Sequence, residues 1–444
     1  MQLRARQGEC MGRHTQSIKR VVMIAACMAG GAEARAKDDL TYLVKRGDTL
    51  YGLSAAYAKG AKAVRHIQQA NHIRLPRRLP TGKTISVPRD LLRFDPIPLR
   101  IVNFSGPVSV SINGSDVSVI KGLTLPEGAL IRTVGNGFVS LVGSDGSRII
   151  LPSQTRVRVA RARRYRLTGS SDIDFAIEQG RAEIRAAKQQ AQGRLRTITP
   201  GVVSAVRGTI FRAGYNQDAN RSVTEVIEGT VETSSQDVTL AIGAGSGVFA
   251  SPEGTLSQAT LLPAPKLQSV GKVQTESVVH FDFTPVPHAG AYLTQVARDA
   301  SFLDIVAESE NVQPVGEFPD IKNGTYFVRS IAVDTNSLHG VDEVWSFRRQ
   351  RVGLSADVSP TALPGGFRVN WMVEGEGTSI FRFQLYSQGN GDVPAVDESG
   401  LLQPGITLTN LKRGLYRWRV GVTQTTSEGS TEVWTSLQQF TVSN

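Results

Sequence analysis

The six histidines are the side chains of this sequence best suited to proton transfer or metal binding, and their spacing supports neither role. They are His14, His66, His72, His280, His288 and His339. None belongs to a His-x-His pair or to His-Glu-x-x-His, the spacing that places two imidazoles and a base on one helix face. No Gly-x-Ser-x-Gly elbow occurs either. The sequence therefore predicts a non-enzymatic protein with no catalytic residues, no metal ligands and no cofactor, although acidic residues are plentiful enough to leave a hydrolase open.

Both cysteines lie close to the N-terminus, as Cys10 and Cys27. The remaining chain can form no disulfide framework, thiolate metal site or cysteine nucleophile.

The first 36 residues have the layout of an export signal. Lys19 and Arg20 precede a short apolar run, 21–31, which is too short to span a bilayer. Small residues then allow cleavage after Ala36, although Met11 would give a more usual start. Two alternatives stay open: lipidation at Cys27, which follows Ile-Ala-Ala, and a buried N-terminal helix. We expect a signal peptide over 1–36 and a protein of the periplasm or cell envelope, with no transmembrane span.

The positive charge of the chain is concentrated in one short region. Residues 37–100 hold thirteen Lys/Arg and five Asp/Glu, whereas the formal net charge of all 444 residues is +11. A basic module attracts anionic polymers. An exported protein rarely meets nucleic acid, so we expect wall carboxylates or lipid phosphates as partners and no nucleic acid; a solvated basic face is the alternative.

The same basic region predicts a compact strand–helix–helix–strand module. Residues 42–44 alternate as a strand, and Gly47 begins a turn where Asp48 or Thr49 can cap a following helix. A second helix is expected over 61–70, closed by Asn71 in the left-handed conformation. The last strand is expected over 84–87.

This segment resembles a LysM domain, the carbohydrate-binding module of cell-wall proteins. The matching residues are Tyr42, Val44, Gly47, Asp48, Thr49, Leu50, Leu53, Tyr57, Ile67, Asn71, Leu79, Gly82, Ile85, Val87 and Pro88. The resemblance implies a shallow groove for N-acetylglucosamine-containing glycan between two loops. The residues it assigns to those loops are Gly47, Asp48, Thr49, Leu50, Tyr51, Asn71, His72, Ile73 and Arg74.

The chemical groups of an N-acetylated sugar suit such a groove. Backbone groups of tight loops can pair with the amide of an N-acetyl group, and Ile73 can contact its methyl. Several of these residues have structural alternatives: Gly47 for the turn, Asp48 and Thr49 as caps, and Leu50 in the core. One shallow groove buries little surface, so we expect modest affinity.

From residue 101 to about 262 the sequence reads as short alternating strands. Asn136-Gly137 and Asp145-Gly146 are hairpin turn signals. The order resembles a FecR-type domain, through Thr199-Pro200, the stretch 206–211 and Glu228-Gly229. In regulatory members this domain relays a signal to a sigma factor. The basic stretch 181–196 is expected to be an insertion with a solvated face.

The last part of the chain repeats weakly. Tyr326 and Trp345 of the first copy recur as Tyr416 and Trp434 of the second. Each copy holds about seven alternating segments, which predicts a β-sandwich, and resembles a fibronectin type III module.

The sequence therefore predicts a mainly β, multidomain chain. Its expected parts are a signal peptide (1–36), a LysM module (37–96), a FecR-like domain (97–262) and two fibronectin type III-like sandwiches (263–352 and 353–444). We expect a non-catalytic scaffold that binds peptidoglycan and presents residues 97–444 to an envelope protein. A periplasmic FecR-type regulator and an unrecognised wall hydrolase are the alternatives.

Overall fold

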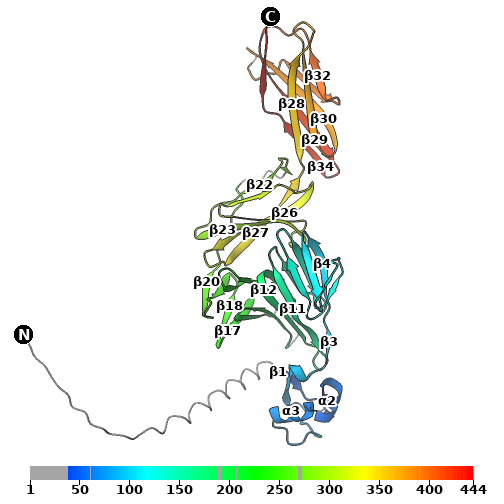
Figure 1. Ribbon diagram of the computed structural model, residues 1–444, viewed down its shortest axis with the longest axis vertical. Coiled ribbons are helices and arrows are strands. Elements are labelled where there is room, and N and C mark those ends of the chain that lie inside the picture. Colours follow the sequence, from blue (N-terminus) through cyan, green and yellow to red (C-terminus); the bar gives the residue numbers. More distant parts are fainter. Residues whose placement is uncertain are drawn as a thin grey trace, which may run out of the picture. The chain divides into compact units, whose positions relative to one another are not determined.

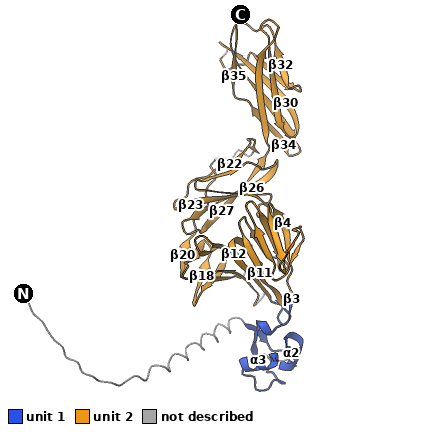
Figure 2. Cartoon of the chain, in the orientation of Figure 1, with its two compact units in different colours: residues 1–95, 165–170 blue, residues 96–164, 171–444 orange. Residues whose placement is uncertain are grey.

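The computed structural model describes residues 39–60, 62–188, 192–206, 208–268, 273–389 and 391–443. They form two compact units (Figure 2): one holds the described residues up to Asp95 together with Tyr165–Ser170, and the other holds the rest. The chain is 58% strand and 5% helix, so the prediction of a mainly β, multidomain protein is confirmed. The expected signal peptide, including Cys27 and Ala36, lies outside the described residues.

The first unit has the predicted strand–helix–helix–strand order (Figure 1). Its elements are β1 Asp39–Leu43, α2 Leu50–Tyr57, α3 Ala63–Ala70, β2 Thr84–Pro88 and a 3-10 turn Arg89–Leu91. The two strands pair antiparallel, with Tyr42 opposite Ile85. The expected start of the second helix, Ala61, lies outside the described residues.

Of the two expected caps for α2, Thr49 is the one used. Its hydroxyl accepts a hydrogen bond from the Gly52 backbone N–H at 3.0 Å. The Asp48 carboxylate instead accepts from the Tyr42 hydroxyl at 2.9 Å and from the Lys45 N–H at 2.7 Å. Asp48 therefore fixes the turn between β1 and α2. Burial and this hydrogen bond raise the pKa of Tyr42 to about 12.

The expected left-handed conformation of Asn71 is wrong. Asn71 has φ −109°, and the next residue, His72, takes positive φ at 51°. The Asn71 amide donates to the Ile67 carbonyl at 2.8 Å and to the Ser86 carbonyl at 2.6 Å, and its oxygen accepts from the Ser86 N–H at 2.6 Å. Two bonds to Ser86 of β2 and one to Ile67 of α3 hold Asn71 in this conformation, and the chain reverses at His72 instead.

The core of the first unit includes one residue from far along the chain. Tyr165 is fully buried, and its ring meets Phe94 edge to face, with centroids 6.4 Å apart. The Arg89 guanidinium lies 5.5 Å from the Tyr165 ring centre, and Arg166 pairs with Asp95 at 2.6 Å. The other buried apolar residues are Leu40, Val44, Leu50, Leu53, Ile67, Ile73, Leu79, Ile85, Val87 and Leu92.

The second unit begins with a domain of two sheets that share one long strand, β12 Ser171–Arg185. The first half of β12 pairs with β11 and, in parallel, with β13; the second half pairs with β10 and β15. The apolar core lies among these strands. The strands are β3 Phe94–Pro96, β4 Leu99–Ser105, β5 Val108–Ile112, β6 Ser115–Val117, β7 Thr124–Leu125, β8 Leu130–Thr133, β9 Phe138–Gly143, β10 Arg148–Leu151, β11 Arg156–Tyr165, β12, β13 Arg194–Thr199, β14 Val202–Val206, β15 Ile210–Asn216, β16 Arg221–Glu228, β17 Thr230–Ser235, β18 Val238–Gly243, β19 Ser246–Ala250 and β20 Leu256–Thr260.

A glycine lets β12 pass from one sheet to the other. Gly180 has φ +75°, and a Cβ there would lie 2.4 Å from the Gln154 carbonyl oxygen. Both the backbone angle and the close approach exclude a side chain.

One of the two predicted hairpin turns is confirmed. Asp145-Gly146 joins the paired strands β9 and β10. Asn136-Gly137 does not make a hairpin, because β8 pairs with β5 and β11 whereas β9 pairs with β4 and β10. This turn packs on the backbone of Gly106 instead, and carries the chain between sheets.

Two sandwich modules complete the second unit. The first pairs a five-stranded sheet, in the order β21-β27-β26-β23-β24, with the two-stranded sheet β22-β25. The second pairs β28-β29-β32 with a sheet of β31, β30, β33, β34 and β35. Tyr326 and Tyr416 are buried near the starts of β26 and β33, at equivalent positions of the repeat. The strands are β21 Val273–Gln274, β22 Val279–Asp282, β23 Ala289–Ala297, β24 Ile305–Asn311, β25 Val315–Phe318, β26 Gly324–Asp334, β27 His339–Arg349, β28 Val352–Pro360, β29 Phe367–Gly375, β30 Thr378–Ser387, β31 Val396–Leu401, β32 Gly405–Leu408, β33 Gly414–Thr426, β34 Gly429–Trp434 and β35 Gln438–Val442.

Within the described residues, no helix combines the length and the hydropathy that a membrane-crossing segment requires.

Candidate functional site

The two loops predicted to bind glycan touch one another in the first unit. The Leu50 N–H donates to the Pro76 carbonyl at 2.8 Å. Beside this bond, the Arg77 guanidinium lies 5.7 Å from the Tyr51 ring centre. The second loop is also held to the strands, since the Val44 N–H donates to the Lys83 carbonyl at 2.9 Å. The loops are therefore fixed by backbone bonds and form a defined surface.

A hollow of about 270 Å³ opens on the second loop. Its floor is apolar and buried: Val44, Ile73, Leu79 and Ile85. Its rim is exposed and mostly polar or basic, with two apolar residues, Pro80 and Leu75, of which Leu75 is 66% exposed. The other rim residues are His72, Arg74, Arg78 and Lys83. An apolar floor with polar groups at the edge suits the mixed surface of an N-acetylated sugar.

The cations at this rim are not neutralised by the protein. In the part of the chain that the structure describes, Arg74, Arg78 and Lys83 form no ion pair with a carboxylate. All three residues are exposed, so their charges face solvent. They favour a negatively charged partner.

The structure places the nine predicted site residues in different environments. His72, Ile73 and Arg74 line the hollow. Tyr51 is half exposed beside Arg77, on the adjoining loop. The remaining predicted residues have structural positions: Leu50 is 1% exposed in the core, Thr49 caps α2, Asp48 and Gly47 form the turn, and Asn71 joins α3 to β2. Leu75, Arg78 and Lys83 line the hollow although they were not predicted; their basic, Pro-rich stretch was the available signal.

The basic stretch 181–196 is not the solvated face that was expected. Arg181 pairs with Glu225 at 2.6 Å, Arg194 with Asp172 at 2.5 Å, and Arg196 with Asp174 at 2.6 Å. Residues far apart in sequence meet because β12 runs parallel to β13, with Asp172 opposite Arg194. Arg194 and Arg196 pair with acids of the adjacent strand, and Arg181 pairs with Glu225 of β16, on the far side of β15, so all three arginines stabilise the sheets.

A second cluster of charges is buried where the two-sheet domain meets the first sandwich. Glu183 of β12 pairs with Arg329 of β26 at 2.9 Å and approaches Arg212 of β15 at 3.6 Å. Both arginines also pair with Asp342 of β27. Burial alone would raise the pKa of Glu183, but the surrounding arginines outweigh it and hold that pKa at about 2.

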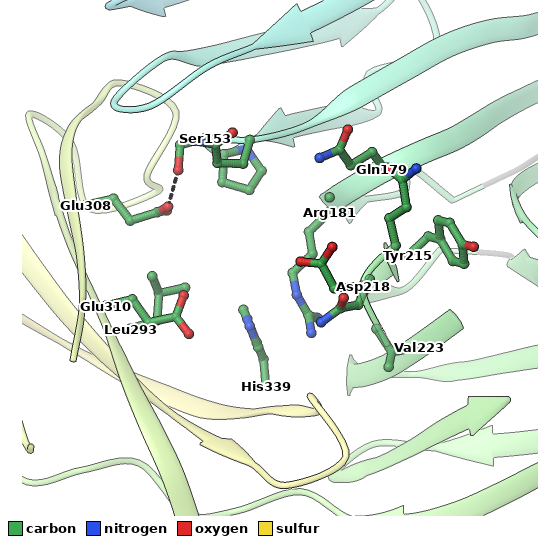
Figure 3. A pocket seen from close by; sticks show the side chains of 15 residues that line it. Ser153, Gln179, Arg181, Tyr215, Asp218, Val223, Leu293, Glu308, Glu310 and His339 are labelled. Carbon is green, nitrogen blue, oxygen red and sulfur yellow. Dashed lines mark hydrogen bonds between the residues drawn. The ribbon is translucent and has the colours of Figure 1, made fainter. Parts of the chain in front are cut away.

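Above this cluster a cleft of about 370 Å³ opens between the same two modules (Figure 3). It contains Ser153, Arg181 and Asp218 on one side, and Glu308 and Glu310 on the other. His339 lies between them. No sequence pattern indicated this site, because its residues come from strands and turns that are far apart along the chain.

Within the described residues, no three His, Cys, Asp or Glu side chains are grouped as metal ligands would be.

Two segments match known families. Residues 42–88 match the LysM domain model. Residues 129–232 match the model of the FecR protein family. The LysM match covers the end of β1, both helices and β2, and the FecR match covers most of the two-sheet domain. Both families are binding or signalling modules typical of envelope proteins.

Comparison with curated proteins found no match. Among solved structures, two crystal structures described as an anti-sigma factor from Parabacteroides distasonis are similar, at 14% and 15% identity. Each similarity covers 30% of this chain and 59% of that one, with a TM-score of 0.26. A segment of two fibronectin type III domains from chicken tenascin is 12% identical over 40% of this chain and 100% of that one, with a TM-score of 0.22. Similarities of this size say nothing about ligands or partners.

Proposed function

We propose that this protein is a non-catalytic adaptor of the cell envelope that binds N-acetylglucosamine-containing glycan of peptidoglycan through its LysM module. The hollow beside His72, Ile73 and Arg74 is the observation that carries the proposal. Its apolar floor suits the acetyl methyl, and its rim cations suit the carboxylates of wall peptides.

The LysM match over 42–88 supports glycan as the ligand class. The hollow is small and open, so a single copy binds weakly unless several copies act on one wall. The FecR-type domain and the sandwiches then serve to recruit another envelope protein, which makes the chain a link between the wall and that partner. We propose domain limits at 37–96, 97–262, 263–352 and 353–444.

Sedimentation with insoluble peptidoglycan tests this proposal. The chain from Lys37 to its end is mixed with purified walls, with and without soluble N-acetylglucosamine oligomers. A Leu75→Ser variant removes an exposed apolar contact at the rim, and Leu402→Ser, which is 71% exposed in the second sandwich, is the matched control. We expect sedimentation that the oligomers reduce, weakened in Leu75→Ser and unchanged in Leu402→Ser. Equal sedimentation of all three chains would place wall binding elsewhere, and release of soluble wall fragments would make the protein a hydrolase.

The FecR match over 129–232 favours one second candidate, a periplasmic regulator. Deletion of the gene separates the two: a regulator changes transcription that depends on one sigma factor, whereas an adaptor changes the amount of a partner retained with the wall.

We propose export with cleavage after Ala36. N-terminal sequencing of the protein purified from cells should begin at Lys37; a lipidated Cys27 at the N-terminus would contradict this.

A further inference from the structure

The cleft between the two-sheet domain and the first sandwich has the construction of a ligand site. Its volume of about 370 Å³ falls in the range of small-molecule pockets. Its walls come from the β10–β11 turn, the kink of β12 and the β15–β16 turn on one side, and from β23, β24 and the start of β27 on the other. Rigid strands on both sides fix the positions of the lining groups (Figure 3).

The charges that line this cleft are predominantly negative. Asp218 and Glu310 face it, as does Glu308, whose pKa burial raises above its usual range, and Arg181 is its one arginine. Arg181 is paired with Glu225 at 2.6 Å, which offsets part of its positive charge. Glu308 is held in place: one of its oxygens accepts from the Ser153 hydroxyl at 2.5 Å and the other accepts from the Gln295 amide at 2.5 Å. The Glu310 side chain forms no ion pair or hydrogen bond with the described residues.

An independent feature of this cleft is His339. Its side chain is only 8% exposed, and Figure 3 shows its ring pointing into the hollow between Glu310 and Arg181. The backbone N–H of His339 donates to Glu225 at 3.1 Å, but the ring forms no hydrogen bond with any described residue. The ring nitrogens are not among the buried side-chain atoms that lack a partner, so they are open to the cleft and available to a ligand that enters it.

The protonation state of the His339 ring defines which ligand groups it can bind. Burial, followed by the charges of Arg181, Arg212 and Arg329, holds the pKa of His339 well below its usual range. The ring is therefore neutral at physiological pH, with one nitrogen that donates and one that accepts a hydrogen bond. The neutral ring can form a hydrogen bond with a polar group of a ligand, and it carries no charge that would repel a cation.

We propose that this cleft binds a small ligand that carries a primary ammonium or guanidinium group next to a hydrogen-bonding group, as a basic amino acid does. The cation lies between Glu308 and Glu310, and the polar group meets the His339 ring. Two sources supply this chemistry: free basic amino acids and wall peptides with an unsubstituted amino group. In either case the ligand would contact the two-sheet domain and the first sandwich at once, so its binding would affect the junction between them.

Titration of the full chain with L-lysine, followed by calorimetry or by NMR, tests the proposal. Nε-acetyl-L-lysine, which lacks the side-chain charge, is the ligand control. Glu310→Gln removes one carboxylate at an exposed position without an internal partner, and Glu398→Gln, exposed on β31, is the protein control. We expect L-lysine to bind, Nε-acetyl-L-lysine and Glu310→Gln each to weaken binding about tenfold or more, and Glu398→Gln to leave it unchanged.

Absence of L-lysine and L-arginine binding at millimolar concentration would overturn the proposal, as would equal binding by Glu310→Gln. Binding of polylysine without binding of either amino acid would also overturn it, and would assign the cleft to a basic protein segment. A His339→Leu variant gives an independent check, since it fills the site with an apolar side chain; retained binding in a folded His339→Leu chain contradicts the role of the ring. Soluble wall peptides, compared with the same peptides after acetylation of their amino groups, distinguish the two sources.

Discussion

Arginine is used in opposite ways in the two units. In the LysM module, Arg74 and Arg78 stand at the exposed rim of a hollow and form no ion pair with any described carboxylate. In the second, β-rich unit, Arg212 and Arg329 are at least 95% buried, and both bind Glu183 and Asp342 across the junction of the two-sheet domain and the first sandwich. The first arrangement leaves charge available to an external anion, and the second uses charge to fix one module against another.

Under the proposed function, the net charge of a module indicates a binding surface better than the density of basic residues along the sequence does. The stretch 181–196 is as basic as the LysM loop, yet its arginines are neutralised by Asp172, Asp174 and Glu225. The excess of positive charge over 37–100 has no such balance. A basic run therefore indicates a partner only when the rest of its domain lacks the acids to pair with it.

The largest effect should come from breaking the buried charge cluster. Arg329→Ala leaves Glu183 buried with less compensation, which costs about 3–5 kcal/mol of unfolding free energy. Urea unfolding of the full chain measures it, with Arg417→Ala, a partly exposed arginine of the second sandwich, as control. Equal stability of the two variants would contradict a structural role for the cluster.

A comparable loss should occur in the LysM unit if its distant core residue is removed. Tyr165→Ala deletes a fully buried ring and should destabilise that unit by about 3 kcal/mol. The measurement is thermal unfolding together with wall sedimentation, because both depend on the folded unit. Tyr51→Ala, half exposed in the same unit, is the matched control for stability; unchanged stability of Tyr165→Ala would exclude Tyr165 from the core.

Protonation of Glu183 in acid should lower the stability of the β-rich unit and leave that of the LysM module unchanged. Its pKa falls from 4.5 in the unfolded chain to about 2 in the folded one, so its contribution is fully present above pH 4.5 and is lost as the pH falls toward 2. The loss is on the order of 3 kcal/mol by linkage. Unfolding measured from pH 5 to pH 2 should show this slope, reduced in Glu183→Gln; an identical slope in both chains would assign the acid sensitivity to other groups.

A smaller effect is expected at the joint between α3 and β2. Asn71→Ala removes three side-chain hydrogen bonds and leaves the Ser86 backbone without its partner, at a cost of about 2 kcal/mol. Chemical denaturation of the chain measures it, and Thr84→Ala at an exposed position of β2 is the control. A cost equal to that of Thr84→Ala would mean that water replaces these bonds.

The smallest effect is expected from the unpaired cations. A double Arg74→Ala, Arg78→Ala variant should fold normally and bind walls a few-fold more weakly at low salt, with the difference reduced at high salt. Arg413→Ala, exposed in the second sandwich, controls for general charge. Wall binding that is independent of salt in every chain would show that the rim cations do not contact the wall.

The sequence predicted the structural elements that depend on residues close to one another along the chain. The two strands, the two helices and the Thr49 cap of the LysM module follow from local patterns, as does the Asp145-Gly146 hairpin. The role of Asn71 was not predictable, because its partner Ser86 lies fifteen residues away.

Contacts between distant strands account for what was missed. Nothing around Tyr165 points to a core in another part of the chain, and nothing around His339 points to Glu308 or Arg181. One signal was available: Asp172 and Asp174 alternate as Arg194 and Arg196 do, as expected for ion pairs between adjacent strands. That match in spacing would have indicated paired rather than solvated arginines.

Methyl NMR of the full chain with an N-acetylglucosamine tetramer tests the central claim most directly. Ile73 is in the floor of the hollow and Leu75 is on its rim, so each has methyl groups at the expected contact. The account predicts saturable shifts of these methyls, with the isoleucines and leucines of residues 97–443 unaffected. Shifts confined to the β-rich unit, or none at saturating tetramer, would contradict glycan binding by the LysM module.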